Sequence, residues 1–261
     1  MDGVAAAALA PLVASPRTTI VVTDYDGTLA PIVADPAAAV PHSRAVELLA
    51  RLAVHYRKVL VVSGRPVSFL AAQVRAPVHL VGLYGLEGAD LGERWEHPNG
   101  GAWREAVADV ASRARAQGPE GMRVELKELS LTLHYREHPE LADEVRAFAE
   151  HAAARAGLAC RPARMSVELH PPIAVDKGTV VEGAADGAAG VVFIGDDVGD
   201  LSAFDALDRL ESGGLRVARV AVRSAEAPAE LLARADVVVE DNDAVMDLLA
   251  YLVDSGDAAA S

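Results

Sequence analysis

The sequence predicts an α/β protein whose core is a doubly wound parallel sheet, with a smaller α/β domain inserted into it. Three observations predict this class. Apolar strands that look buried on both faces alternate with helical patterns near both ends of the chain. In the middle of the chain, the strands tend to alternate apolar and polar residues, as in a sheet with one solvated face. The length of 261 residues, 51% of them hydrophobic, leaves room for both parts.

The first strand of the core is the β-branched run Thr18 to Thr23, which breaks at Asp24. Apolar residues then recur at helical spacing over 43–56, and a second buried strand over 59–62 ends at Ser63. A strand, a helix and a strand in this order form a parallel unit, so Asp24 and Ser63 lie at the carboxyl ends of neighbouring strands.

The last third of the chain repeats this alternation. A buried strand over 191–194 runs into Gly195-Asp196-Asp197 and is followed by a helix over 201–207. Strands over 217–222 and 237–239 and a helix over 244–253 continue the pattern. Both ends of the chain therefore belong to one doubly wound sheet.

The middle of the chain forms a separate layer. We expect strands over Val124 to Tyr135 and over 166–169, and helices over 103–116 and 141–156. Glycine and proline punctuate both borders of this layer. The predicted domains are therefore 1–87 with 173–261 for the core and 88–172 for the insertion.

Composition excludes several classes of partner. A formal net charge of −14 argues against a surface that binds nucleic acid or anionic lipid, and no apolar run reaches the roughly 20 residues that cross a bilayer. Cys160 is the only cysteine, so no intramolecular disulfide forms. The alanine-rich segment Met1 to Ser15 lacks the basic start of a leader and is expected to form a frayed or loosely docked helix. We expect a cytoplasmic protein without nucleic-acid or membrane partners.

Four groups of polar residues follow strands or begin helices of the core. They are Asp24-Tyr25-Asp26-Gly27-Thr28, Ser63, Lys177 and the run Gly195 to Asp200. Ligands bind outside the carboxyl ends of the strands in such sheets, so these groups converge. Two aspartates at i and i+2 repel each other unless a divalent cation with oxygen ligands lies between them, which favours Mg²⁺. Taken alone, Asp-x-Asp-Gly-Thr could equally be an Asx-turn after a strand.

Together these segments resemble the four motifs of the haloacid dehalogenase (HAD) superfamily, in its phosphatase branch. The resemblance implies that Asp24 attacks phosphorus to form an aspartyl-phosphate and that Asp26 acts as acid and base. Ser63 and Lys177 would hold the phosphoryl oxygens. The predicted Mg²⁺ ligands are Asp24, Asp26, Asp196 and Asp197.

Simpler readings remain open for three of these residues. Ser63 could be a turn residue after its strand. Lys177 could be a solvated lysine at a helix end, although only three lysines remain in this arginine-biased chain. Asp200 could orient Lys177 or a water on the metal, or it could cap the helix that begins at Leu201.

The inserted layer lies between Ser63 and Lys177, which resembles HAD members with a C2-type cap. Arg123 to Arg136, with Gly85-Leu86-Glu87, Ser63-Gly64-Arg65 and Val167 to Pro172, looks like trehalose-6-phosphate phosphatases. That resemblance implies sugar contacts from Glu125, Lys127 and Glu168, and further substrate contacts from the residues Arg65, His134 and Arg136. Many relatives read Asn-His-Gly-Leu-Glu where this chain has Leu83-Tyr84-Gly85-Leu86-Glu87. Glu125 and Lys127, at i and i+2 of one expected strand, could instead form an ion pair on a solvated sheet face.

The expected function is Mg²⁺-dependent hydrolysis of trehalose 6-phosphate to trehalose and phosphate. Another sugar phosphate, such as sucrose phosphate or a glycosyl-phosphoglycerate, would require the same core residues. A non-catalytic regulator that binds a phosphosugar is the alternative from a different class. The expected partner is a small sugar phosphate, and a functional pairing with trehalose-6-phosphate synthase fits the resemblance.

Overall fold

The structure is a computed structural model of the chain, and it describes residues 3–33, 35, 38–163, 165–224 and 227–260. The chain divides into two compact units. The core unit consists of Met1–Trp95 and Val175–Ser261, and the inserted unit of Glu96–Ala174. The first border follows Trp95 and not Glu87, because the two strands after Leu86 extend the sheet of the core unit.

The core unit is built on one eight-stranded sheet with the order β12-β11-β10-β1-β2-β3-β4-β5. Strands β1, β2, β3, β10, β11 and β12 pair in parallel, whereas β4 runs antiparallel to β3. From β1 the chain builds the sheet outward in one direction through β2 and β3, and later in the other direction through β10, β11 and β12. The strands are β1 (Thr19–Thr23), β2 (Lys58–Val62), β3 (His79–Gly82), β4 (Glu87–Asp90), β5 (Glu93–Glu96), β10 (Gly190–Gly195), β11 (Arg216–Val222) and β12 (Val237–Val239).

Helices cover both faces of this sheet, which confirms the predicted doubly wound α/β class. Alternate residues of β1 face opposite sides, so that Val21 packs in one apolar cluster while Ile20 and Val22 pack in the other. On the side of Val21 lie α1 (Gly3–Val13), α2 (Ala45–His55), α3 (Val67–Gln73) and α9 (Asn242–Ala260). On the other side lie α6 (Lys177–Ala184), α7 (Leu201–Ser212) and α8 (Ala229–Arg234). Short 3₁₀ turns span Pro16–Thr18, Leu83–Gly85, Gly101–Trp103, Pro139–Leu141 and Val198–Asp200.

The N-terminal helix α1 is docked, which corrects the expectation of a frayed or loosely attached helix. Leu9 and Leu12 are 0% and 1% exposed and belong to the apolar cluster on the side of Val21. The buried hydroxyl of Thr19 donates to the carbonyl of Leu12, 3.0 Å away. The alanine-rich composition concealed this, because two leucines three residues apart are enough to anchor one face of a short helix.

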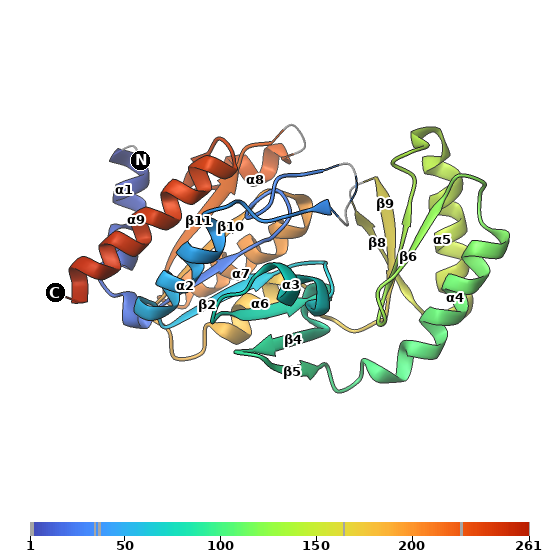
Figure 1. Cartoon of the computed structure of the whole chain (residues 1–261), viewed down its shortest axis with the longest axis horizontal. Helices are drawn as coiled ribbons and strands as arrows, with labels where there is room; N and C mark the ends of the chain where they lie inside the picture. The colour runs from blue at the N-terminus through green and yellow to red at the C-terminus, as the bar shows by residue number, and fades with distance from the viewer. Residues whose placement is uncertain (1–2, 34, 36–37, 164, 225–226, 261) are drawn as a thin grey trace. The chain divides into compact units, whose positions relative to one another are not determined.

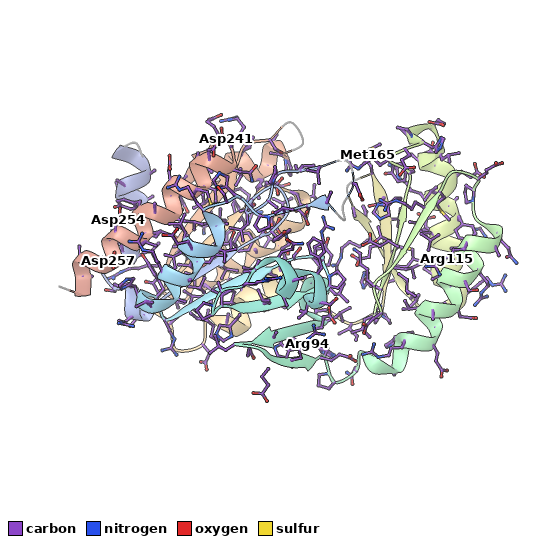
Figure 2. All side chains as sticks on the ribbon, in the orientation of Figure 1. Arg94, Arg115, Met165, Asp241, Asp254 and Asp257 are labelled. Atoms are coloured by element: carbon purple, nitrogen blue, oxygen red, sulfur yellow. The ribbon has the colours of Figure 1, made fainter. Side chains whose placement is uncertain are left out.

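Helix α9 packs along α2, and ion pairs border the contact. Arg51 on α2 lies 3.0 Å from Asp257 and 3.6 Å from Asp254, and both acids project from α9 (Figure 2). Tyr56, just after α2, donates to the carbonyl of Leu252. These contacts fix the last helix on the first half of the core unit.

The inserted unit has two layers. A four-stranded antiparallel sheet, with the order β6-β7-β9-β8, carries α4 and α5 on one of its faces (Figure 1). The elements are α4 (Arg104–Gln117), β6 (Arg123–Leu126), β7 (Leu131–His134), α5 (Ala142–Ala156), β8 (Ala159–Ala163) and β9 (Ser166–His170). Leu131 and Leu133 face the helices, so Thr132 and His134 lie on the opposite face of the sheet.

The segment expected as strand over Val124 to Tyr135 is in fact a hairpin. Strand β6 ends at Leu126, and the amide of Lys127 donates to the carbonyl of Ser130 across the turn. Glu128 adopts a left-handed backbone with φ 62°. Lys127 therefore lies in the turn and not on a strand face with Glu125, which corrects the expected i, i+2 arrangement.

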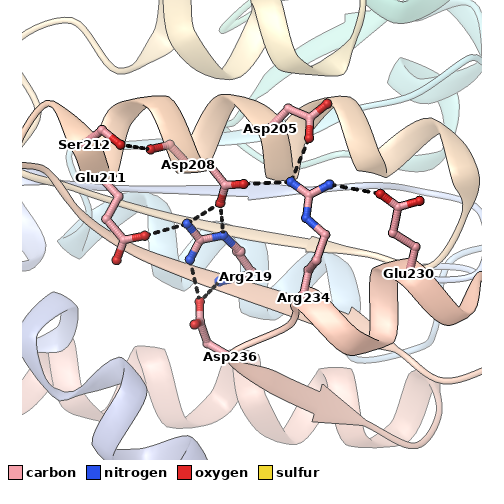
Figure 3. Close-up of polar contacts among 8 residues, drawn as sticks. All are labelled: Asp205, Asp208, Glu211, Ser212, Arg219, Glu230, Arg234 and Asp236. Atoms are coloured by element: carbon pink, nitrogen blue, oxygen red, sulfur yellow. Dashed lines mark hydrogen bonds and ion pairs between the residues drawn. The ribbon is translucent and has the colours of Figure 1, made fainter.

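A network of ion pairs ties α7 to the outer strands of the core sheet (Figure 3). The side chain of Arg219, on β11, is only 8% exposed and lies 2.6 Å from Glu211 and 3.2 Å from Asp236. Its guanidinium also donates to Asp208 on α7. Arg234 at the end of α8 bonds Asp205 and Asp208 on α7. One buried cation thus joins α7 to the residue that precedes β12.

We predict that Arg219→Met lowers the free energy of unfolding by about 1 to 2 kcal/mol, because charge-assisted hydrogen bonds to three partly exposed acids are lost. Arg216→Met is the matched control, since Arg216 lies on the same strand but is exposed, and it should change stability by about 0.5 kcal/mol or less. Urea unfolding monitored by circular dichroism measures both. Equal effects of the two substitutions would contradict a structural role for the network.

Candidate active site

Asp24 lies at the topological switch point of the core sheet, between the ends of β1 and β10. Its amide donates to the carbonyl of Ile194, 2.8 Å away, which continues the pairing of the two strands to their carboxyl ends. Asp196 follows β10 directly, so both carboxylates reach the same crevice. Asp24 is 3% exposed and Asp196 is 0% exposed.

The loop after Asp24 is held from the far end of the chain. Gly27 adopts φ 82°, and a Cβ added there would lie 2.1 Å from the carboxylate of Asp196, so only glycine fits this turn. The side-chain amide of Asn242, the first residue of α9, donates to the carbonyls of Gly27 (3.1 Å) and Thr28 (2.7 Å). Sequence reasoning missed Asn242, because nothing in its local pattern connects it to residues some two hundred positions earlier.

Lys177 connects Asp24, at the end of β1, to Asp200, in the loop after β10. It is the first residue of α6, whose start is fixed by a capping box between Asp176 and Thr179. Its ammonium lies 2.8 Å from Asp24 and 2.6 Å from Asp200, and the side chain is 2% exposed. Lys177 is therefore not a solvated lysine at a helix end.

Asp200 holds Lys177 and the backbone of the neighbouring loop at the same time. One carboxylate oxygen accepts from Lys177, and the other accepts from the amides of Asp196 (2.8 Å) and Asp197 (3.0 Å). Its side chain makes no capping bond to α7. The arrangement favours the interpretation that Asp200 orients Lys177.

Burial dominates the electrostatics of this cluster. It raises the pKa of the Asp24 carboxyl well above its usual range, and the charges of Asp200, Asp197 and Asp196 act in the same direction, whereas Lys177 opposes them. Burial also raises the pKa of Asp200 to about 6, against the opposing charge of Lys177. For Lys177, burial alone would lower the pKa, but Asp200 and Asp24 together hold it well above its usual value.

The acids fit a hard divalent cation. Asp24, Asp196 and Asp200 each offer an oxygen within 4.8 Å of the others, and one ammonium does not balance the carboxylates around it. The buried Oδ1 of Asp197 has no hydrogen-bond partner in the described part of the chain. All these donors are oxygens, which Mg²⁺ prefers.

The carboxylate of Asp26 pairs with Arg65. The guanidinium of Arg65 forms a two-pronged contact with the Asp26 carboxylate, at 2.8 Å and 2.7 Å. Arg65 also stacks on Phe69, with its Cζ 4.6 Å from the ring centroid. Both side-chain oxygens of Asp26 are thus engaged by Arg65, and its carboxylate is not among the clustered acids of the described residues.

Ser63 is buried at the end of β2. Its amide donates to the carbonyl of Val81, which aligns it with β3, and its hydroxyl accepts from the amide of Arg65, 3.1 Å away. The loop 63–65 also receives hydrogen bonds from the amides of Leu83 and Tyr84. Sequence reasoning singled out Ser63 but did not find Tyr84 as a neighbour of this loop.

Polar residues from three strands gather on the helix-free face of the inserted sheet. Glu125, Thr132 and Glu168 lie in register across β6, β7 and β9. His134 contacts Glu125 at 2.8 Å, and Ser130 donates to Glu168 at 2.7 Å. The structure thus brings together the predicted residues Glu125, His134 and Glu168, while Lys127 and Arg136 lie outside the strands.

Two further residues of this face were missed by sequence reasoning. Arg161 on β8 is in register with Glu168 and extends the polar row to the fourth strand. Thr132 is 3% exposed, and its hydroxyl has no hydrogen-bond partner among the residues that the structure describes. A signal for Thr132 was present, because it is the polar residue between two buried leucines of one strand.

In chemical terms, the core unit offers a buried carboxylate, a fixed ammonium and a cluster of carboxylate oxygens. Such a set suits attack on an electrophile whose oxygens carry negative charge. No helix among the described residues is long and apolar enough to cross a membrane.

Comparisons with known proteins also relate the chain to phosphatases. A sequence model of the family described as trehalose-phosphatase matches residues 22–237. The trehalose-phosphate phosphatase of Mycobacterium leprae is 31% identical over 220 residues, which are 77% of this chain and 50% of that protein. The chain thus spans about half the length of such curated relatives.

Solved structures share the fold. The structure of a trehalose-6-phosphate phosphatase related protein superposes with a TM-score of 0.77 at 20% identity, covering 92% of this chain and 99% of that one. A haloacid dehalogenase-like hydrolase from Bacteroides thetaiotaomicron gives a TM-score of 0.63 at 17% identity, covering 90% and 99%. The chain therefore shares the fold of these two solved proteins.

We predict that Thr132→Val leaves the protein as stable as before or stabilises it by about 1 kcal/mol, because it removes a buried hydroxyl that makes no hydrogen bond. Thr19→Val is the matched control: the Thr19 hydroxyl is buried and bonded, so its loss should cost about 1 to 2 kcal/mol. Calorimetric unfolding of both variants measures the difference. Destabilisation by Thr132→Val as large as that by Thr19→Val would show that the hydroxyl has a partner in the folded protein.

Proposed function

The chain belongs to the trehalose-phosphatase family, and from this premise we propose that it hydrolyses trehalose 6-phosphate to trehalose and phosphate. The observation that carries the proposal is the buried contact between Lys177 and Asp24 at the switch point of the sheet. It pairs a carboxylate nucleophile with a fixed cation where a phosphoryl group would bind.

The proposed reaction has two displacements. Asp24 attacks phosphorus, a bond forms between its carboxylate oxygen and phosphorus, and the bond from phosphorus to the sugar oxygen breaks. Asp26 gives its proton to the departing sugar oxygen. In the second step Asp26 takes a proton from water, whose oxygen attacks phosphorus and releases phosphate and the Asp24 carboxylate.

The remaining core residues hold the phosphoryl group and the catalytic acids. Lys177 and Ser63 donate to the phosphoryl oxygens, on which charge accumulates during transfer. Asp200 keeps Lys177 in place through their 2.6 Å contact. Arg65 fixes the orientation of the Asp26 carboxylate. We propose that Arg65 also contacts the substrate, because its guanidinium lies beside this acid.

We propose that Asp24, Asp196 and Asp197 hold Mg²⁺ in this site. Asp24 and Asp196 belong to the clustered acids, whereas the third member, Asp200, already accepts hydrogen bonds from Lys177 and two amides. The buried Oδ1 of Asp197, which has no hydrogen-bond partner among the described residues, supports Asp197 as the third ligand. We do not include the Asp26 side chain among these ligands, because its carboxylate pairs with Arg65 and is not part of the acidic cluster found among the described residues. When bound, the ion neutralises phosphoryl charge and keeps Asp24 ionised.

The inserted unit is proposed to act as a cap that selects the sugar. Glu125 and Glu168 offer carboxylates on the helix-free face of its sheet, and acids of this kind accept hydrogen bonds from sugar hydroxyls. Lys127, His134 and Arg136 are proposed to contact the substrate from the adjoining turns and strand. We further propose a cytoplasmic location and a functional pairing with a trehalose-6-phosphate synthase.

A different sugar phosphate, such as sucrose phosphate or a glycosyl-phosphoglycerate, would use the same core residues. A regulator that binds a phosphosugar without turnover is the alternative from another class. The buried position of Asp24 against Lys177 favours catalysis over binding alone, since a binding site gains nothing from a desolvated nucleophile.

We predict that the purified chain with Mg²⁺ releases phosphate from trehalose 6-phosphate faster than from sucrose phosphate, a glycosyl-phosphoglycerate or glucose 6-phosphate. Asp24→Asn should lower kcat by about 10⁴-fold or more, because no covalent intermediate can form. Glu168→Gln should lower kcat/KM for trehalose 6-phosphate by about 10- to 100-fold, since a charged hydrogen bond to a sugar hydroxyl is lost. A phosphate-release assay measures all three.

Control experiments distinguish hydrolysis of trehalose 6-phosphate from binding without turnover and from hydrolysis of another substrate. Asp109→Asn, a substitution of an exposed acid on α4, should leave turnover unchanged. If Asp24→Asn still binds trehalose 6-phosphate in calorimetry and the wild-type chain never turns it over, the regulator is the better reading. If the Glu168→Gln variant keeps the same preference among these sugar phosphates, the natural substrate is a different one.

We predict that Mg²⁺ stabilises the protein by about 2.7 kcal/mol at a concentration 100 times its Kd, because binding to the folded state alone shifts the equilibrium. The resulting rise in Tm, followed by differential scanning fluorimetry, should disappear with excess EDTA. Asp196→Asn should lose the rise, whereas Asp109→Asn should keep it. An equal rise in the Asp196→Asn variant would place the ion elsewhere.

A further inference from the structure

The turn over Leu83–Gly85 holds its backbone in an uncommon conformation. Leu83 and Tyr84 have φ values of 49° and 58°, and Gly85 follows with 114°. Left-handed backbone is unfavourable for residues with a Cβ, and two such residues in succession persist only where surrounding contacts enforce them. Conformations of this kind concentrate at functional sites.

The contacts that enforce the turn come from the loop after β2. The amide of Tyr84 donates to the carbonyl of Ser63, and the amide of Leu83 donates to the carbonyl of Arg65, each at 3.0 Å. The turn is therefore bonded directly to residues that flank the proposed phosphoryl site. Its strain sets the direction in which the Tyr84 side chain leaves the backbone.

The Tyr84 ring lies against two loops of the site. A Cβ added at Gly64 would lie 2.6 Å from the Tyr84 hydroxyl oxygen and from Cζ, so glycine is required for the ring to be there. A Cβ added at Gly199 would lie 3.6 Å from Cε1. Gly64 follows Ser63 and Gly199 precedes Asp200. The phenol is also within electrostatic range of the Lys177 ammonium.

This position gives the hydroxyl a chemical use. The neighbouring acids, Asp24, Asp196 and Asp197, can only accept hydrogen bonds when ionised, so a phosphoryl group needs donors from other residues. A phenol donates without adding charge, and the half-buried Tyr84 stands beside the donors Ser63 and Lys177.

We propose that Tyr84 is a further catalytic residue, whose hydroxyl donates a hydrogen bond to a phosphoryl oxygen of the bound substrate. This inference rests on the proposed phosphatase function. Tyr84 forms no covalent bond and transfers no proton; it stabilises the charge that develops on the phosphoryl oxygens while Asp24 attacks and while water later displaces Asp24.

The experiment compares Tyr84→Phe, which keeps the ring and removes the donor, with Tyr84→His. We expect Tyr84→Phe to lower kcat/KM by about 10- to 100-fold for trehalose 6-phosphate and for p-nitrophenyl phosphate alike, since the lost bond is to the phosphoryl group. Tyr84→His should recover most of the loss, because a neutral imidazole N–H donates and histidine tolerates left-handed backbone better than most residues. Tyr251→Phe, on α9, is the control without effect.

A second measurement tests the role of Tyr84 independently of the proposed phosphatase function. Titration calorimetry with inorganic phosphate and Mg²⁺ should show about 10-fold weaker binding to the Tyr84→Phe variant, with Tm within about 2 °C of the wild type. If the wild-type chain turns over no phosphate ester, the proposed function fails while phosphate binding still tests Tyr84. Turnover and phosphate affinity of Tyr84→Phe within about twofold of the wild type would overturn the role of Tyr84.

Discussion

The contact of Lys177 with Asp24 and Asp200 is the interaction on which the rest of the site depends. One ammonium, 2.8 Å and 2.6 Å from the two carboxylates, joins α6 to the end of β1 and to the loop after β10. Asp200 in turn fixes the amides of Asp196 and Asp197. Removing the cation would leave several buried acids facing each other without compensation, which is why its pKa is held so high.

The core residues could be predicted from the sequence because local pattern determines where they lie. Asp24, Ser63 and Asp196 each come directly after a run of apolar residues that forms a strand, and parallel strands deliver their carboxyl ends to one edge. The fold class and the strand positions are confirmed for the same reason. Docking of α1 was mispredicted, since composition does not show how well two leucines fit a groove.

Contacts between residues that are distant in the chain could not be predicted from the sequence. The bond from Asn242 to the loop after Asp24, the ring of Tyr84 on Gly64 and the row that joins Arg161 to Glu168 all depend on tertiary packing. The turn between β6 and β7 was missed for a local reason. It contains no glycine, proline or asparagine, and Glu128 takes the left-handed position instead.

The bond from Asn242 to the loop after Asp24 has a consequence for the order in which the protein matures. The loop at 24–28 is synthesised well before Asn242, because the inserted unit and the strands β2 to β12 lie between them in the chain. Every sequence motif of the site is therefore synthesised before the site can take its final form. A nascent chain that has not yet placed α9 carries the candidate site residues without their final support, so folding of α9 is also the step that completes the candidate site.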